Sequence, residues 1–269
     1  MEKGIWKEIE QLYQQFQQLG ISEAVDYEKF HLYSLITNST AIEGSTLTEI
    51  DTQLLFDEGV TAKGKPLVYH LMNEDLKKAY ELAKVEVRHN TPITAAILQK
   101  LNAVLMHTTG SAYNVMGGSF DSSKGEYRLC GVTVGSGGRS YMSYQKVPAK
   151  VEELCSILQE KQKTAGTLQE QYELSFNAHL NLVTIHPWVD GNGRTARLLM
   201  NYIQYCNNLF PTKVFKEDRG DYILSLQQSQ DVETNQPFLE FMATQLKKSL
   251  SQEIETFNTS RKKGFSFMF

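Results

Sequence analysis

Residues 186–197 read His-Pro-Trp-Val-Asp-Gly-Asn-Gly-Arg-Thr-Ala-Arg, and this stretch says most about the fold and the chemistry of the chain. Pro187 disfavours a helical conformation at His186, and residues 190–193 have the composition of a tight turn. Apolar residues at helical spacing stand before and after it: Leu174, Ala178, Leu182 and Ile185, then Leu198, Leu199 and Ile203. The sequence therefore predicts a helix, a short loop and a second helix, with loop amides at a helix N-terminus, where anions bind.

The charged side chains of this stretch match the needs of a phosphate site. Arg194 and Arg197 are predicted in the first turn of the second helix, where the helix dipole disfavours each cation by about 0.3–1 kcal/mol. A bound polyphosphate would reverse that sign. Asp190 suits a divalent ion such as Mg²⁺, and the imidazole of His186 is a candidate base at neutral pH. Taken singly, each feature is common in turns and helix ends, so their joint spacing carries the prediction.

Composition sets broad limits on function. The chain has 269 residues, 41% hydrophobic and 22% charged, and a formal net charge of −4. Such a balance does not predict nucleic-acid binding, so an anion site must be local. The three cysteines at positions 130, 155 and 206 fit neither a disulfide framework nor a zinc site. The first residues lack the apolar run of a signal peptide, and no stretch approaches the ~18 apolar residues of a membrane span. We therefore expect a cytoplasmic protein that binds neither nucleic acid nor membrane.

Most of the remaining sequence predicts helices. They are expected at residues 5–19, 27–43, 46–56, 67–87, 93–106, 149–162 and 169–185. Thr46 and Glu49 would form a capping box, and Pro92 would stand at a helix start. Between Gly110 and Pro148 glycines cluster, and two short strands at 132–134 and 140–144 flank residues 135–138, which is a β-hairpin signal. The expected fold is mainly α with a small hairpin.

The stretch 186–197 resembles the motif of the Fic (Fido) family, His-Pro-Phe-x-(Asp/Glu)-Gly-Asn-Gly-Arg-x-x-Arg, with Trp188 in place of the usual Phe. The resemblance implies a Fic-type helical bundle with a β-hairpin flap. Residues 91–245 would form the catalytic core. Residues 1–90 would be an N-terminal helical extension that carries an inhibitory helix at about 27–44, and residues 246–269 the end of the C-terminal helix and a tail.

The same resemblance implies a protein adenylyltransferase, which moves AMP from Mg-ATP to a Ser, Thr or Tyr hydroxyl of a target protein or of the enzyme itself. His186 would deprotonate that hydroxyl, and Asp190 would bind Mg²⁺. Gly191, Asn192 and Gly193 would surround the phosphates, and Arg194 and Arg197 would hold the β- and γ-phosphates. The segment at 125–128 and the hairpin after it resemble the family's flap, so a target protein is expected to dock around residues 130–144.

A second segment, Ser39-Thr-Ala-Ile-Glu43-Gly44, places a glutamate at the C-terminal end of a predicted helix, which is unfavourable for an anion. It resembles the inhibitory motif (Ser/Thr)-x-x-x-Glu-(Gly/Asn) of N-terminally autoinhibited Fic proteins. By that resemblance Glu43 would pair with Arg197 and block productive placement of the γ-phosphate, while Ser39 would help fix the inhibitory helix.

Several alternatives stay open at this point. Glu43 is compatible with the reverse reaction, removal of AMP from a modified protein, and relatives transfer other phosphate-containing groups. An alternative from a different functional class is an interaction module that binds nucleotide without catalysis. Asn201 and Tyr222 are weaker candidates for the nucleotide pocket, and self-association into a homo-oligomer is compatible with the sequence.

Overall fold

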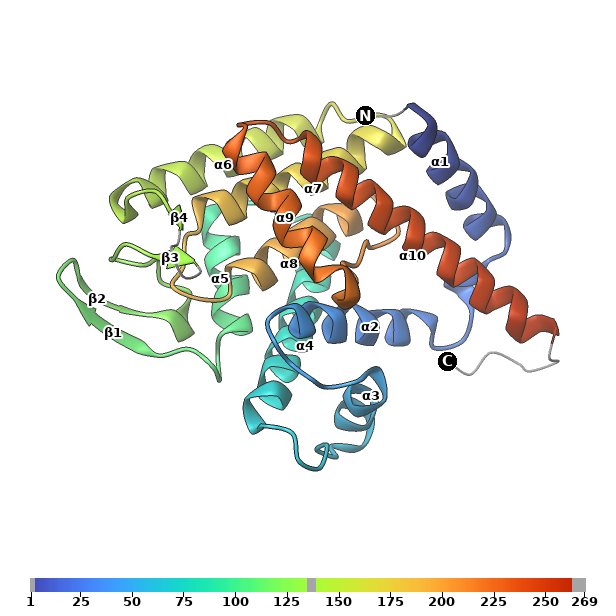
Figure 1. Ribbon diagram of the computed structural model, residues 1–269, viewed down its shortest axis with the longest axis horizontal. Coiled ribbons are helices and arrows are strands. Elements are labelled where there is room, and N and C mark those ends of the chain that lie inside the picture. The colour runs from blue at the N-terminus through green and yellow to red at the C-terminus, as the bar shows by residue number, and fades with distance from the viewer. Residues whose placement is uncertain (1–2, 135–138, 263–269) are drawn as a thin grey trace. The chain divides into compact units, whose positions relative to one another are not determined.

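The computed structural model describes residues 3–134 and 139–262, and it is mainly helical (Figure 1). The chain divides into two compact units, Met1–Lys65 with Thr212–Phe269, and Pro66–Pro211. The first unit contains α1 (Lys3–Gln18), α2 (Tyr27–Ile42), α3 (Glu49–Glu58), α9 (Arg219–Asp231) and α10 (Gln236–Lys262). The second contains α4 (Leu67–Arg88), α5 (Ala95–Leu105), α6 (Val147–Gln162), α7 (Leu168–Ile185) and α8 (Asn192–Cys206). Short 3-10 turns lie at Ile21–Glu23, Ser122–Lys124, Tyr144–Lys146 and Lys216–Asp218. The predicted mainly α fold is confirmed.

In the first unit α1 runs along α10, α9 packs against α10, and α2 packs against α3 (Figure 1). The amphipathic helix α1 places Trp6, Ile9 and Phe16 in the core, because these residues recur at the three-to-four-residue spacing of one helical face. Burial of such apolar side chains is the main favourable contribution to the stability of a helical unit.

In the second unit α7 and α8 form the central pair, with α6 against α7, and α4 and α5 against α8. Its core is rich in aromatic side chains that are almost completely buried, namely Tyr80, Tyr172, Phe176, Trp188 and Tyr202. The helix–loop–helix predicted for residues 174–203 is therefore the centre of this unit, and the packing of both helices fixes the loop between them.

Two β-hairpins occur between α5 and α6. In the first, β1 (Ala112–Val115) pairs with β2 (Gly118–Asp121), and the rings of Tyr113 and Phe120 stack with centroids 5.1 Å apart. In the second, β3 (Thr133–Val134) pairs with β4 (Arg139–Ser140). The second hairpin confirms the predicted one, whose turn at 135–138 lies outside the described residues. The first was not predicted from the sequence.

The start signals predicted for two helices differ from the observed ones. Helix α3 begins at Glu49, and its capping box consists of Thr48 and Asp51: Asp51 N donates to Thr48 Oγ1 (3.1 Å), and Thr48 N donates to Asp51 Oδ2 (2.9 Å). The predicted box of Thr46 and Glu49 was shifted by two residues, since aspartate satisfies the same amide as glutamate. Helix α5 begins at Ala95, after the cap Thr94, so Pro92 precedes the helix instead of starting it.

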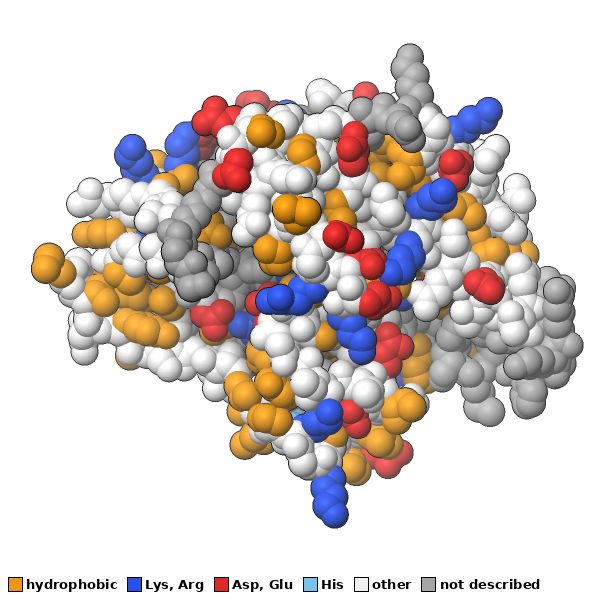
Figure 2. Space-filling view, in the orientation of Figure 1, with side chains coloured by type: hydrophobic (Ala, Val, Ile, Leu, Met, Phe, Trp, Pro, Cys, Tyr) orange, Lys and Arg blue, Asp and Glu red, His pale blue; other side chains and the backbone are white. Residues whose placement is uncertain are grey.

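Charged side chains of both signs are interspersed on the face shown in Figure 2, in keeping with the small net charge. Over residues 3–134 and 139–262, none of the helices combines the length and the apolarity that a bilayer crossing requires.

Candidate active site

His186 lies at the C-terminal end of α7, in the left-handed conformation with φ 52° and ψ 63°. Its amide still donates to Leu182 O (3.0 Å), so the helix ends on this residue, as the following Pro187 predicts. The ring nitrogen Nδ1 lies 3.3 Å from Val183 O. A carbonyl oxygen only accepts, so in this contact Nδ1 carries the proton and Nε2 is the basic nitrogen of the neutral ring. The tautomer that a general base needs is thus held by the helix end.

Trp188 anchors the loop after His186. Its side chain is fully buried, and its indole Nε1 donates to Gly125 O (2.9 Å). Its backbone is bracketed by Asn192, whose Oδ1 accepts from Trp188 N (3.0 Å) and whose Nδ2 donates to Trp188 O (2.9 Å). The larger ring at this motif position is therefore accommodated, and the Asn192 side chain is used to fix the loop.

Gly191 requires its lack of a side chain. It has φ 77°, and a Cβ here would lie 2.8 Å from Met106 Sδ and 3.0 Å from Asn102 Nδ2. From this glycine the chain enters α8, where the first intrahelical bond runs from Thr195 N to Gly191 O (2.8 Å). The amides of residues 192–194 consequently have no acceptor within the helix. The predicted amide-lined helix N-terminus is present.

Arg194, in the first turn of α8, is buried with 2% of its surface exposed. Its Nη2 lies 3.4 Å from both Met106 Sδ and Asp190 Oδ1. The Nε and Nη1 atoms are buried and have no hydrogen-bond partner among the described residues. The Asp190 side chain is 62% exposed, so the pair is weak. A buried guanidinium with two unpartnered nitrogens at a helix N-terminus has donors that suit an anion.

Asp190 is the candidate metal ligand. Its Oδ1 accepts from Gly191 N (2.5 Å), which holds the carboxylate at the mouth of the loop. One exposed carboxylate fits Mg²⁺ at a nucleotide site, because that ion takes one or two carboxylates and completes its shell with phosphate and water. The donor set of the loop is therefore compatible with a magnesium–nucleotide complex.

Arg197 lies in the second turn of α8 and not in the first turn, where the sequence analysis placed it, because the helix already begins at Asn192. It is 3% exposed. Burial lowers the pKa of His179, and the positive charge of Arg197 lowers it further. Burial raises the pKa of Tyr80, against the opposing effect of that charge. The guanidinium therefore lies in a desolvated environment, where its charge lowers the pKa of both neighbours.

Asn201, two turns into α8, is buried and its amide is engaged. Its Oδ1 accepts from Tyr80 Oη (2.6 Å), and its Nδ2 donates to Gln204 Oε1 (2.9 Å). Tyr222, the other weak candidate, lies in the first unit on α9. It is 2% exposed, and its ring centroid is 5.9 Å from that of Phe241.

The flap hairpin contacts His186 directly. The ring of Tyr141 stacks on the imidazole, with centroids 3.8 Å apart and an interplanar angle of 18°. Arg128, fully buried, donates from Nε to His186 O (2.8 Å), from Nη1 to Cys130 O (2.8 Å) and from Nη2 to Met142 O (2.7 Å). The sequence analysis did not select Arg128, because its partners are up to 58 residues away along the chain and no local sequence pattern indicates them.

The candidate inhibitory segment ends α2 in the first unit. Ser39 is buried, and Glu43 is the exposed C-cap residue, followed by Gly44 with φ 101°. The end of this helix is anchored by Arg219, whose Nε donates to Ile42 O (2.7 Å). Glu43 therefore stands at the unfavourable helix end, as the sequence predicted.

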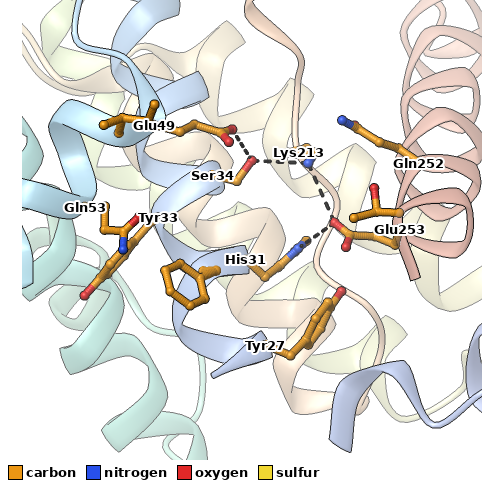
Figure 3. Close-up of a pocket in the computed structure, with 12 residues that line it drawn as sticks. Tyr27, His31, Tyr33, Ser34, Glu49, Gln53, Lys213, Gln252 and Glu253 are labelled. Atoms are coloured by element: carbon orange, nitrogen blue, oxygen red, sulfur yellow. Dashed lines mark hydrogen bonds and ion pairs between the residues drawn. The ribbon is translucent and has the colours of Figure 1, made fainter. Parts of the chain in front are cut away.

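A cavity of about 270 Å³ borders the N-terminal half of α2 (Figure 3). On its wall, Lys213 Nζ lies 3.2 Å from Ser34 Oγ and 3.8 Å from Glu253 Oε1, and Glu253 Oε1 lies 3.3 Å from His31 Nδ1. These polar contacts bind α2 to α10 and to the segment before α9, and they fix the helix that carries Ser39 and Glu43.

Comparison with known proteins agrees with this geometry. The family model described as Fic/DOC family matches residues 92–204. The protein adenylyltransferase Fic of Drosophila grimshawi is 29% identical over 228 residues, which cover 82% of this chain and 41% of that protein. The Drosophila willistoni protein of the same name is 29% identical over 231 residues, 82% of this chain and 40% of its own length. The chain thus spans about two fifths of these curated relatives.

Two solved structures share the fold. A Fic-domain signaling protein from Bacteroides thetaiotaomicron has a TM-score of 0.79 at 24% identity, over 97% of this chain and 100% of that one. Fic-1 from C. elegans, residues 134–508, has a TM-score of 0.76 at 20% identity, over 95% and 72%. The motif loop, the helical bundle and the hairpin thus accord with the match of residues 92–204 to the Fic/DOC family model.

Proposed function

We propose that this chain is a protein adenylyltransferase, which transfers AMP from Mg-ATP to a hydroxyl of a target protein. The names of its curated relatives support this activity, and one observation on the site carries it: buried Arg194, with Nε and Nη1 unpartnered among the described residues, at the N-terminus of α8. A buried charged donor without an acceptor is costly, by about 1–3 kcal/mol or more for each unmade bond. A bound triphosphate supplies the missing acceptors.

The loop offers the remaining contacts for that triphosphate. We assign the phosphate contacts of Asn192 and Gly193 to their main-chain N–H groups, because the Asn192 side chain already holds Trp188. Gly191, whose N–H donates to Asp190, lines the phosphate site with its backbone. Arg194 and Arg197 hold the β- and γ-phosphates. Asp190 holds Mg²⁺, which when bound neutralises phosphate charge. Charge neutralisation and positioning are the main requirements of phosphate-transfer catalysis.

The chain's own base is His186. Its Nε2 accepts the proton of the target hydroxyl while that oxygen forms a bond to the α-phosphorus of ATP. The bond from the α-phosphorus to the bridging oxygen breaks, and pyrophosphate leaves. We assign target docking to the flap around residues 130–144, since Tyr141 of this hairpin already contacts the imidazole.

We also propose that Ser39 of α2 and Glu43, the C-cap residue of this helix, regulate the transfer activity. We propose that Glu43 pairs with Arg197 and keeps ATP in a pose unsuited to transfer. The support is the motif together with the charges: an anion at a helix C-terminus, and a buried arginine that phosphates require. Glu43 and Arg197 belong to separate compact units. The proposed pairing is therefore tested by an experiment on transfer activity.

The test is intact-mass spectrometry after incubation with Mg-ATP. Glu43→Gly should acquire an AMP adduct faster than wild type, and His186→Ala should abolish the adduct in both backgrounds. Glu58→Gly is the matched control, because Glu58 ends α3 before Gly59 just as Glu43 precedes Gly44. A phosphate adduct would identify a different transferred group, and no adduct in Glu43→Gly would favour a binding module.

The reverse direction is tested with the same proteins. Glu43→Gly that already carries AMP is incubated with wild type and Mg²⁺ in the absence of ATP. Loss of the adduct would show that the intact chain removes AMP, and persistence of the adduct supports transfer as the activity.

A further inference from the structure

Arg128 lies where the flap begins, and it connects three segments that are distant in sequence. Its guanidinium donates to a carbonyl on each side of the β3–β4 hairpin, at Cys130 and Met142, and to the carbonyl of His186. Its own amide donates to Pro187 O (3.1 Å). One side chain therefore ties both ends of the flap to the residue that carries the candidate base.

The charge of Arg128 makes this arrangement unusual. The side chain is fully buried, and burial lowers the pKa of its guanidinium. Within residues 3–134 and 139–262 it forms no ion pair, and three carbonyl dipoles face the cation. A buried cation of this kind is expensive for a fold. Its planar fork reaches three acceptors at once, which the single ammonium of a lysine does not reproduce.

Neighbouring contacts join the same two segments. Trp188, two residues after the base, donates to Gly125 O (2.9 Å), and the rings of Tyr127 and Trp188 lie 5.9 Å apart. Tyr141 from the far side of the hairpin stacks on the ring of His186. The flap and the base loop thus form one body, with Arg128 at its centre.

We propose that Arg128 is a positioning residue: it fixes the flap relative to His186, so that a hydroxyl held on the flap meets Nε2. The inference rests on the proposed transfer of AMP. Among the described residues, the partners of its guanidinium are all main-chain carbonyls of the flap and the base loop, whereas the anion site is built by Gly191, Asn192 and Arg194. Loss of Arg128 should therefore slow transfer and leave nucleotide affinity unchanged.

The experiment uses Arg128→Lys in the full-length Glu43→Gly background, with Arg88→Lys as the same change at an exposed position. The self-AMPylation rate at saturating Mg-ATP should fall by about 10²-fold, the loss expected for a misplacement near 1 Å. The Kd of ATP, measured by calorimetry, should stay within about twofold, a change worth less than half a kcal/mol. An unchanged rate, or a parallel loss of ATP affinity, would overturn the proposal.

Two further measurements separate positioning from general stability. In Arg128→Ala, free guanidinium should restore part of the rate and ethylammonium should not, since only the former supplies the fork. Amide exchange should accelerate at Tyr141, whose N–H donates to Val132 O, and stay unchanged in α7. Equal effects of both cations, or exchange raised throughout, contradict the role. If Glu43→Gly with intact Arg128 acquires no adduct, the transfer proposal fails, and the exchange measurement still decides on Arg128.

Discussion

Arg128 and Arg194 are both buried arginines of the same compact unit, and they differ in how their nitrogens are used. Three nitrogens of Arg128 donate to carbonyls at 2.7–2.8 Å. Arg194 has a thioether and one exposed carboxylate near Nη2, and Nε and Nη1 have no partner in the described part of the chain. A satisfied buried arginine organises its own fold, whereas an unsatisfied one is prepared for a ligand.

This difference assigns separate tasks to two sides of His186. On the flap side, Arg128 holds geometry that exists without substrate. On the α8 side, Arg194 leaves donors that only an anion satisfies. Loss of the Arg128 side chain should therefore lower the stability of the nucleotide-free protein. Loss of the Arg194 side chain should instead lower the stability that the protein gains from bound nucleotide.

The largest effect is expected for Arg128→Met. The change removes the donor of three part-buried carbonyls, and each hydrogen bond from a charged donor contributes about 1.5–3 kcal/mol to the free energy of unfolding. Urea denaturation of the nucleotide-free protein measures it, with Arg88→Met as the exposed control. A loss no larger than that of the control would show that the carbonyl contacts of Arg128 contribute little.

Arg194→Met should give the opposite pattern. Without nucleotide the stability should be retained or increased, because an unpartnered buried cation is replaced by an apolar side chain of similar length. With ATP at 100 times its Kd, wild type should gain about 2.7 kcal/mol, and Arg194→Met should lose most of that gain. Thermal unfolding with and without Mg-ATP measures both, and a full ATP shift in the variant would contradict the anion site.

Gly191→Ala should disturb the Arg194 side alone. The new methyl would approach Met106, which contacts Arg194, and the backbone has φ 77°, so a cost of about 1–3 kcal/mol is expected. Gly220→Ala, in the helix α9 with nothing within 4 Å, should instead stabilise by about 0.5–1 kcal/mol. Denaturation curves compare the two variants, and equal shifts would disprove the steric argument.

The smallest effect concerns a third buried cation, Lys213, which has a carboxylate partner (Figure 3). Burial raises the pKa of Glu253, but the hydrogen bond of His31 and the charges of His31 and Lys213 outweigh it, so the pKa lies below its ordinary value of 4.5. Since the folded pKa is depressed, the contribution is present above about pH 4.5 and is lost as pH falls through the folded pKa.

Glu253→Gln should therefore flatten the acid limb of the stability profile of the protein and leave the profile near neutral pH parallel to that of wild type. Urea midpoints measured between pH 3 and 7 test this sign. An unchanged acid limb would show that the Glu253 carboxyl does not titrate differently in the folded and unfolded states.

The sequence predicted the elements whose signals are local. Pro187 set the end of α7, and the spacing of Leu198, Leu199 and Ile203 set α8. It did not reveal β1–β2, although Gly118, with φ 125°, permits the tight turn that joins these strands. The alternation of apolar and polar residues that marks a strand is weak in this segment. The contact between Tyr113 and Phe120 exists only in the folded hairpin.

The site divides in the same way. His186, Asp190 and the two arginines of α8 follow from a contiguous stretch, but the state of their nitrogens depends on packing against α5. Arg128 was out of reach of a sequence argument, because its partners at 130, 142 and 186 converge only in three dimensions. Placement of Arg197 in the second turn of α8 also required the observed helix start at Asn192.

The contacts of Arg128 are all made to the main chain, and this has a consequence for how the flap can vary. A carbonyl is present whatever side chain a residue carries, so positions 130 and 142 can be substituted without removing an acceptor. Side chains on the surface of the hairpin can therefore be changed to suit new targets, while Arg128 keeps the hairpin aligned with His186. Libraries that diversify the flap and keep Arg128 are the practical form of this consequence.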